Sequence, residues 1–273
     1  MSKKRIIALD LDGTLLTSER TISSNTLQLL EQLQQDGHKV VISTGRPVSG
    51  ASRIADELHL DQYEGFLMAY NGGVIQNWQN KDFVHSVFLS KDAIELANRY
   101  AKESGFSIVC YYDKYIVSDS DMNPYMEYSM KRNGLNFKKV NDFIEDVTYP
   151  ISKCMVIGEP EGLQLLEQRI ISNNHSCFCV YRSEPYFLEV VPPGIDKAAG
   201  LKVLLNHLGF SQSQLIAFGD GYNDISMLRF AGIGVAMSNA AEEVKAMADI
   251  IAPSNNEEGV FRALSELIQN STQ

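Results

Sequence analysis

Two groups of acidic residues are the first candidates for chemistry in this chain. Asp10 and Asp12 are two residues apart and directly follow a run of apolar residues. The second group, Gly219–Asp224, contains Asp220 and Asp224 and follows another apolar run. Residues two apart on a strand point to the same face, and ligands of open α/β sheets bind beyond the carboxyl ends of the strands. If both apolar runs are central strands, four carboxylates converge at one edge of a sheet.

Four such carboxylates need a compensating positive charge. Two like charges ~4 Å apart at an effective dielectric constant of ~20 repel by about 4 kcal/mol. A hard divalent cation relieves this repulsion, and carboxylate, carbonyl and water oxygens are the ligands that suit Mg²⁺. The sequence has no His or Cys close to either acidic group, which disfavours zinc. The predicted cofactor is therefore Mg²⁺.

An anion-binding segment accompanies the acids. Ser43-Thr44-Gly45-Arg46 follows a predicted strand and precedes a helix start at Pro47, so its hydroxyl and backbone N–H groups can hold phosphate oxygens. Lys197 opens a later predicted helix and can supply a fixed cation. Aspartate is an established phosphoryl nucleophile, and a second Asp two residues on is placed to act as general acid and base. These residues predict phosphoryl transfer with Asp10 as nucleophile and Asp12 as acid/base.

The elements that must position these residues alternate between strands and helices at both ends of the chain. Such alternation predicts βαβ units, and hence an α/β fold with a doubly wound, Rossmann-like parallel sheet. The predicted strands are Arg5–Leu11, Val40–Ser43, Gly65–Tyr70, Leu215–Phe218, Ile233–Val235 and Ile250–Ile251. The first predicted helix has Ser23 or Ser24 as its N-cap and is stopped by Gly37. The other predicted helices are Pro47–Leu58, Lys197–Leu208, Asn223–Phe230 and Glu258–Ile268.

The middle of the chain has a different composition. It holds many β-rich pieces with helical stretches near Asp92–Ser104 and Glu161–Ser172, which predicts an α+β domain inserted into the core. We place the core at residues 1–83 and 192–273 and the insert at 84–191, so the run Val84–Leu89 falls in the insert. Glu189 is a polar residue amid an apolar strand of this region, and we favour exposure at a sheet edge for it.

Composition limits the possible partners. The 273 residues carry 34 Asp+Glu against 24 Lys+Arg, a formal net charge of −10, which argues against a non-specific nucleic-acid binder. No stretch approaches the ~18 apolar residues of a membrane span. The four cysteines show no metal-ligand or redox spacing, which indicates reduced thiols and a cytoplasmic location.

Taken in order, these segments resemble the four signature motifs of the haloacid dehalogenase superfamily of phosphohydrolases. Asp10-Leu11-Asp12-Gly13-Thr14 matches the first motif, Thr44 with Gly45 the second, Lys197 the third, and Gly219-Asp220 with Asn223-Asp224 the fourth. The insertion of ~110 residues between the second and third motifs resembles the Cof-type, or class IIB, sugar-phosphatase branch.

This resemblance implies roles for individual residues. Asp10 is the implied nucleophile and a metal ligand, Asp12 the acid/base whose backbone carbonyl also touches the metal, and Asp220 a direct ligand. Asp224 is implied to bind the metal or to orient its water, and the insert to be a mobile cap that selects the leaving group. The implied phosphoryl-binding groups are Thr44, Gly45, Lys197, Asn223 and the Leu11 backbone. We add Arg46 as a group that either contacts substrate or braces the cap, and Asn71-Gly72-Gly73 as either a loop facing the site or a plain hairpin turn.

The function predicted is that of a Mg²⁺-dependent phosphoric monoester hydrolase acting on small phosphorylated metabolites, with sugar phosphates favoured. A sugar phosphomutase is the alternative enzyme, and it would yield an isomeric phosphate in place of inorganic phosphate. A non-catalytic phosphate-binding regulator is disfavoured because both Asp10 and Asp12 are present. A nicotinamide-binding protein is disfavoured because no Gly-x-Gly-x-x-Gly follows the first strand. No nucleic-acid or membrane partner is predicted, and the substrate and oligomeric state are left open.

Overall fold

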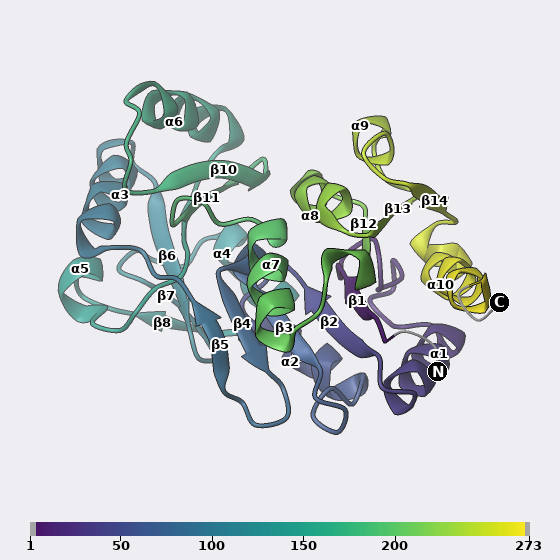
Figure 1. Ribbon diagram of the computed structural model, residues 1–273. Coiled ribbons are helices and arrows are strands. Elements are labelled where there is room, and N and C mark those ends of the chain that lie inside the picture. Colours follow the sequence, from purple (N-terminus) through teal and green to yellow (C-terminus); the bar gives the residue numbers. More distant parts are fainter. Residues whose placement is uncertain (1–3, 271–273) are drawn as a thin grey trace. The chain divides into compact units, whose positions relative to one another are not determined.

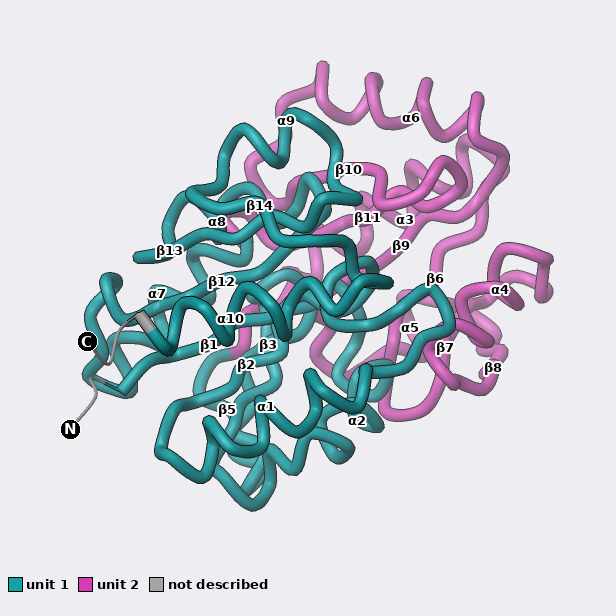
Figure 2. The backbone as a smooth tube through the Cα atoms, turned by 90° about the vertical axis from the view of Figure 1, so that its right-hand side faces the viewer, with its two compact units in different colours: residues 1–85, 196–273 teal, residues 86–195 magenta. Residues whose placement is uncertain are grey.

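The computed structural model describes residues 4–270, with the side chain of Asn270 excepted. The chain forms two compact units, drawn in different colours in Figure 2. Unit 1 runs up to His85 and resumes at Asp196, and unit 2 is the stretch Ser86–Ile195 between them. The division differs from the predicted junctions after Phe83 and Val191. At the first junction the reason is β5, the strand Phe83–Ser86, which extends the sheet of unit 1. The predicted run Val84–Leu89 therefore begins in unit 1.

Unit 1 is built on one eight-stranded sheet (Figure 1). Its strand order is β14 (Ile250–Ala252), β13 (Ile233–Met237), β12 (Leu215–Gly219), β1 (Ile6–Leu9), β2 (Lys39–Ser43), β3 (Phe66–Ala69), β4 (Val74–Asn77) and β5. Neighbouring strands from β14 to β3 run parallel, and β4 is antiparallel to β3. In register, Leu9 lies opposite Phe218 on one side and Ile42 on the other. The three strands that carry the predicted motifs are therefore neighbours, with their carboxyl ends at one edge.

Helices cover both faces of this sheet. The helices are α1 (Ser24–Gln35), α2 (Val48–Glu57), α7 (Lys197–Leu208), α8 (Ile225–Phe230), α9 (Glu242–Lys245) and α10 (Gly259–Asn270). Helices α1, α2 and α10 pack in one apolar cluster with Ile7 and Leu9, whereas α7 and α8 pack in another with Ile6 and Ala8. Successive strand residues point to opposite faces, so these two clusters lie on opposite sides of β1. The predicted doubly wound α/β fold is confirmed.

Short 3₁₀ turns lie at several of the connections in unit 1. They are η1 (Tyr70–Gly72), η2 (Gln212–Gln214), η3 (Tyr222–Asp224) and η4 (Asn255–Glu257). The predicted helix Asn223–Phe230 is therefore divided into η3 and α8. Of the described helices, none is long and apolar enough to cross a bilayer.

Unit 2 is an α+β unit with its own six-stranded sheet. The strand order is β10 (Cys179–Glu184), β11 (Phe187–Val191), β9 (Cys154–Ile157), β6 (Ser107–Tyr112), β7 (Tyr115–Ser118) and β8 (Asn136–Lys139). Its helices are α3 (Lys91–Glu103), α4 (Pro124–Asn133), α5 (Phe143–Asp146) and α6 (Pro160–Ser172). Residues of α3, α5 and α6 share one apolar cluster with the sheet. Helix α4 is missing from the sequence prediction, although Asn123 as N-cap, Pro124 at the first turn and Gly134 as C-cap mark its limits.

The interpretation of Glu189 as an edge residue is wrong. Its strand, β11, lies between β10 and β9, and the side chain is buried beside the ammonium of Lys153, with Oε2 2.6 Å from Nζ. The hydroxyl of Ser183 on β10 donates a hydrogen bond of 2.7 Å to Oε1. A buried carboxylate is tolerated here because a cation and a hydroxyl meet it.

Helix α7 approaches the turn between β3 and β4 so closely that two glycines are required. A Cβ on Gly200 would lie 2.7 Å from the Cα of Gly72 and 2.6 Å from Sδ of Met68. Gly72 itself has a φ of +97°, which disfavours any other residue. Asp196 caps the helix, accepting a hydrogen bond of 2.8 Å from the N–H of Ala199. This packing fixes the first turn of α7, where Lys197 lies.

Replacing Gly200 with Ala tests this close packing. Helix propensity alone predicts a gain in stability of about 1 kcal/mol, whereas the contact with Gly72 predicts a loss of about 1–3 kcal/mol. We expect the loss, measured as the free energy of unfolding in denaturant titrations. Gly162→Ala in α6 is the matched control, since its Cβ would meet only the movable ring of Phe106. A Gly200→Ala protein at least as stable as the wild type would contradict the packing argument.

Candidate active site at the carboxyl edge of the sheet

The predicted site residues follow the carboxyl ends of adjacent strands of unit 1. Asp10 continues β1, and its N–H donates a hydrogen bond of 3.0 Å to the carbonyl of Phe218 on β12. Asp220 comes directly after β12, and Thr44 directly after β2. Because these strands are parallel neighbours, their following loops meet at one edge of the sheet.

Three of the four predicted carboxylates gather there. Asp10, Asp220 and Asp224 each offer an oxygen, and these oxygens lie within 4.8 Å of one another. The proximity of Asp10 and Asp220, which the sequence argument requires, is therefore present in the structure. The ammonium of Lys197, with no exposed surface, lies 2.6 Å from Oδ1 of Asp10 and 2.5 Å from Oδ1 of Asp224. Its third partner is the carbonyl of Ser43, at 2.8 Å.

Asp224 is held differently from the other two acids. Its Oδ2 accepts hydrogen bonds from the backbone N–H groups of Asp220, at 2.9 Å, and Gly221, at 2.8 Å. A Cβ on Gly219 would lie only 2.5 Å from the Cβ of Asp224, so glycine is required beside it. With Lys197 on the other oxygen, this buried carboxylate fixes the loop after β12.

The positive charge in the cluster is too small to balance the charges of its three carboxylates. Burial, together with Asp224 and Asp220 and against the opposing effect of Lys197, raises the pKa of Asp10 to about 8. Burial and the neighbouring acids likewise raise the pKa of Asp220 to about 6, although the hydrogen bond from Thr14 opposes the shift. Burial disfavours the charge of Lys197, but Asp10 and Asp224 outweigh it and raise its pKa to about 12. One lysine thus leaves the acids short of a counter-charge, and this all-oxygen donor set suits a hard divalent cation.

The side chain of Asp12 is bound outside this cluster. Arg46 donates to both of its oxygens, from Nε to Oδ2 at 2.8 Å and from Nη2 to Oδ1 at 2.5 Å. Nη1 of Arg46 also donates to the carbonyl of Gly50, at 3.1 Å. All four carboxylates are predicted to lie together, whereas in the structure Asp12 pairs with a guanidinium, whose two parallel hydrogen bonds fix its orientation.

The second and fourth motifs meet through an asparagine. Nδ2 of Asn223 donates to Oδ1 of Asn71, at 3.0 Å, and the N–H of Asn71 donates to the carbonyl of Thr44, at 2.9 Å. Asn71 has a φ of +54°, and a Cβ on Gly45 would lie 3.2 Å from its Oδ1. The segment beginning at Asn71 is thus both a turn between β3 and β4 and a loop facing the site.

Two further contacts of the site are absent from the sequence prediction. Thr14 lies within the first motif, and its hydroxyl donates a hydrogen bond of 2.7 Å to Oδ1 of Asp220. Asn239 lies beyond β13, and its Nδ2 donates to the carbonyl of Gly13, at 2.9 Å. Asn239 follows a parallel strand next to β12, so the strand-end rule used for the acids points to it as well.

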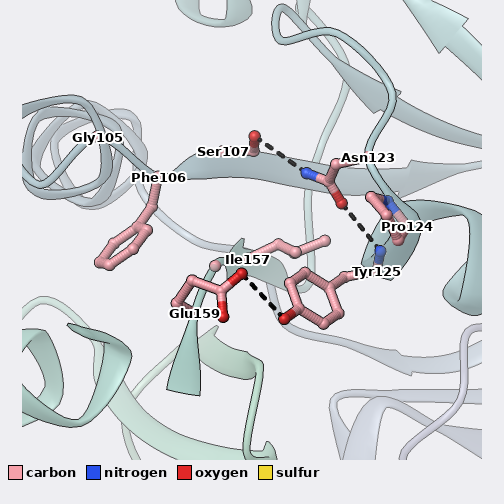
Figure 3. A pocket seen from close by; sticks show the side chains of 9 residues that line it. Gly105, Phe106, Ser107, Asn123, Pro124, Tyr125, Ile157 and Glu159 are labelled. Carbon is pink, nitrogen blue, oxygen red and sulfur yellow. Dashed lines mark hydrogen bonds between the residues drawn. The ribbon is translucent and has the colours of Figure 1, made fainter. Parts of the chain in front are cut away.

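Unit 2 contains a pocket of about 390 Å³ (Figure 3). Phe106, Tyr125 and Ile157 contribute apolar walls, and the hydroxyl of Tyr125 donates to Glu159, at 3.2 Å. The described residues that line this pocket include no predicted site residue. The acidic cluster of unit 1, and not this pocket, therefore holds the residues that the sequence predicts for phosphoryl transfer.

Comparison with known proteins shows the family to which the chain belongs. The sequence model of the haloacid dehalogenase-like hydrolase family matches residues 7–264. A 5-amino-6-(5-phospho-D-ribitylamino)uracil phosphatase of Bacillus subtilis, YitU, is 30% identical over 279 residues, covering 97% of this chain and 98% of its own.

Two solved structures share the fold. A haloacid dehalogenase-like hydrolase from Bacteroides thetaiotaomicron is 40% identical with a TM-score of 0.93, covering 97% of this chain and 100% of its own. The HAD subclass IIB sugar phosphatase BT4131 is 25% identical with a TM-score of 0.79, covering 97% and 99%. The resemblance noted in the sequence is confirmed, and the chain belongs to the haloacid dehalogenase-like hydrolase family.

Proposed function

We propose that this phosphoric monoester hydrolase works through a covalent phosphoryl intermediate on Asp10, with Mg²⁺ as its cofactor. The proposal rests on one observation, the cluster in which Asp10 touches a fully buried Lys197 and lies within a cation's reach of Asp220. Membership of the family and the match to phosphatases support action on small phosphorylated substrates.

Asp10 starts the proposed reaction. Its carboxylate attacks phosphorus, the bond between phosphorus and the leaving oxygen breaks, and Asp12 protonates that oxygen. Asp12, now a carboxylate, takes a proton from water, which attacks phosphorus, releases inorganic phosphate and regenerates Asp10. Lys197 supports the first step because its charge opposes protonation of Asp10. The equatorial oxygens gain charge during transfer, and we assign their stabilisation to the positive charge of Lys197 and to a hydrogen bond from Asn223. The hydroxyl of Thr44, with the backbones of Leu11 and Gly45, completes that set.

Arg46 receives a role that differs from both predicted ones, contact with substrate and bracing of the cap. Its guanidinium binds both oxygens of Asp12 and the carbonyl of Gly50. We therefore assign to Arg46 the orientation of the acid/base carboxylate. A carboxylate held by two hydrogen bonds in one plane keeps a fixed orientation, in which it can take the proton from water in the second step.

Asp10 and Asp220 are the proposed side-chain ligands of Mg²⁺, with the backbone carbonyl of Asp12 as a third group. When bound, the ion would supply Lewis-acid stabilisation of the phosphoryl oxygens and the missing counter-charge. Both oxygens of Asp224 already accept hydrogen bonds, from Lys197 and from two backbone N–H groups. We therefore propose that Asp224 orients the loop and its ligands and that direct coordination belongs to the other acids.

The inserted unit is proposed to select the leaving group. It is joined to unit 1 after His85 and again before Asp196, one residue ahead of Lys197. Sugar phosphates are the first substrates to test, because the chain is similar to a HAD subclass IIB sugar phosphatase. The ribitylamino-uracil phosphate named for YitU is the second. The four free cysteines favour a cytoplasmic enzyme.

Asp10→Asn tests the nucleophile. We expect release of phosphate to fall by at least about 10³-fold, because the amide cannot attack phosphorus, while circular dichroism stays that of a folded protein. The assay is inorganic phosphate released from a panel of sugar phosphates. The control is Asp61→Asn, at an exposed position, which should leave the rate unchanged. Retained turnover in Asp10→Asn would mean that the nucleophile is assigned to the wrong residue, and formation of an isomeric phosphate would favour the mutase.

Metal removal tests the cofactor. Treatment with EDTA should abolish phosphate release, and added Mg²⁺ should restore it, because the acids otherwise lack a counter-charge. Zn²⁺ added to the same stripped protein should restore less activity, since the site offers oxygen ligands only. Full activity in a rigorously metal-free sample would refute the role of the metal.

The raised pKa values predict how stability depends on pH. Asp10, near 8, and Asp220, near 6, stay protonated in the folded metal-free protein at pH values where the unfolded chain has lost those protons. The folded state therefore binds more protons between about pH 4 and 8, and its stability falls as pH rises through that range. We expect the melting temperature to decline less in Asp220→Asn than in the wild type, and Mg²⁺ to stabilise the wild type more at pH 8 than at pH 5. Identical pH profiles for the two proteins would contradict the assignment.

A further inference from the structure

Asn239 bridges the two loops that carry the acids. It lies in the connection after β13, and its Nδ2 donates to the carbonyl of Gly13 at 2.9 Å while lying 3.5 Å from Oδ2 of Asp220. An amide nitrogen carries two hydrogens, so one side chain can serve both oxygens. Asn239 thus contacts the loop after β1 and the loop after β12 at the same time.

The amide of Asn239 is itself held in orientation. Its Oδ1 accepts a hydrogen bond of 3.2 Å from the N–H of Asn255, and Nδ2 of Asn255 donates to the carbonyl of Leu16, at 2.8 Å. Because Oδ1 faces a donor, Nδ2 must face the carbonyl of Gly13. The connection after β13 is anchored in turn, since the N–H of Ser238 donates to the carbonyl of Ala252, at 2.8 Å.

The orientation of Asp220 depends on these contacts. Thr14 donates to Oδ1, at 2.7 Å, and Asn239 lies beside Oδ2. A Cβ on Gly13, whose φ is +85°, would lie only 2.2 Å from Oδ2 of Asp220, so the backbone of the first loop packs directly on this carboxylate. A shift of the Gly13 backbone would therefore change the packing contact that limits the orientation of the Asp220 carboxylate.

We propose that Asn239 is a positioning residue that holds Asp220 in the orientation needed to bind the divalent cation. The inference rests on the proposed function, in which Asp220 is a metal ligand. Groups that orient metal ligands typically contribute 10–100-fold to metal affinity. The side chain of Asn239 is exposed, and water can replace part of its contribution, so the lower end of that range applies.

The test measures metal binding by calorimetry on the full-length protein without substrate. Asn239→Ala should raise the dissociation constant for Mg²⁺ about tenfold, and should raise the Mg²⁺ concentration for half-maximal activity by the same factor. At saturating Mg²⁺, its kcat and its KM for substrate should return to within about twofold of the wild type. Asn239→Ser, whose hydroxyl is too short to span both loops, should behave in the same way and serves if the alanine variant is poorly folded.

Asn256→Ala is the matched control. Asn256 also binds the segment after the first motif, through the N–H and hydroxyl of Ser18 at 2.9 Å each, and these hydrogen bonds do not involve Gly13 or Asp220. It should lose similar stability and keep Mg²⁺ affinity within about twofold of the wild type. Unchanged Mg²⁺ affinity in folded Asn239 variants would overturn the inference, as would an equal loss in Asn256→Ala.

Asp220→Asn separates this inference from the proposed function. If Asp220→Asn loses Mg²⁺ binding while the Asn239 variants keep it, the metal site stands and the positioning role is wrong. If Asp220→Asn binds Mg²⁺ as the wild type does, the metal site itself is wrong, and the role of Asn239 falls with it.

Discussion

A lysine ammonium without exposed surface lies between the carboxylates of Asp10 and Asp224, and the arrangement of unit 1 follows from it. Burying such a charge costs several kcal/mol unless every hydrogen finds an acceptor, and here two carboxylates and the carbonyl of Ser43 provide three. The three acceptors come from the residue after β1, from the last residue of β2 and from the loop after β12. A change in any one of these segments leaves either the cation or an acid uncompensated.

The parallel sheet makes this convergence possible. Strands β2, β1 and β12 are consecutive in the sheet although β12 is far away in sequence, so their carboxyl ends lie side by side. Backbone contacts then set the fine geometry. Gly13 allows its loop to pack against Asp220, and Gly219 leaves space for Asp224. The close contact of Gly72 with Gly200 fixes the start of α7, where Lys197 lies. At each of these glycines, the Cβ of any other residue would clash with the backbone of a neighbouring segment or with one of the acids.

Much of this could be predicted from the sequence because the signals are local. The apolar runs that become β1, β2 and β12 are short, buried and followed by polar residues, and a parallel sheet leaves one edge where such residues can meet. The contacts that escaped prediction depend on partners distant in sequence. The pairing of Asp12 with Arg46 and the burial of Glu189 against Lys153 are decided by tertiary packing, which periodicity does not encode. Two missed features do have a local signal. Asn239 follows a parallel strand next to β12, and the caps of helix α4 are visible in Asn123 and Gly134.

Because Lys197 is completely buried, the chemical reactivity of its amine reports on local opening of the site. Reagents that acylate amines need a neutral amine that they can reach. The Lys197 nitrogen is charged and buried as long as it is bound to its three acceptors. Labelling of Lys197 would then proceed only during excursions in which α7 detaches from the sheet edge, at a rate set by the free energy of that local opening. The fraction of Lys197 that carries the label, measured by mass spectrometry, would report whether the site is folded, even in a sample that has no activity.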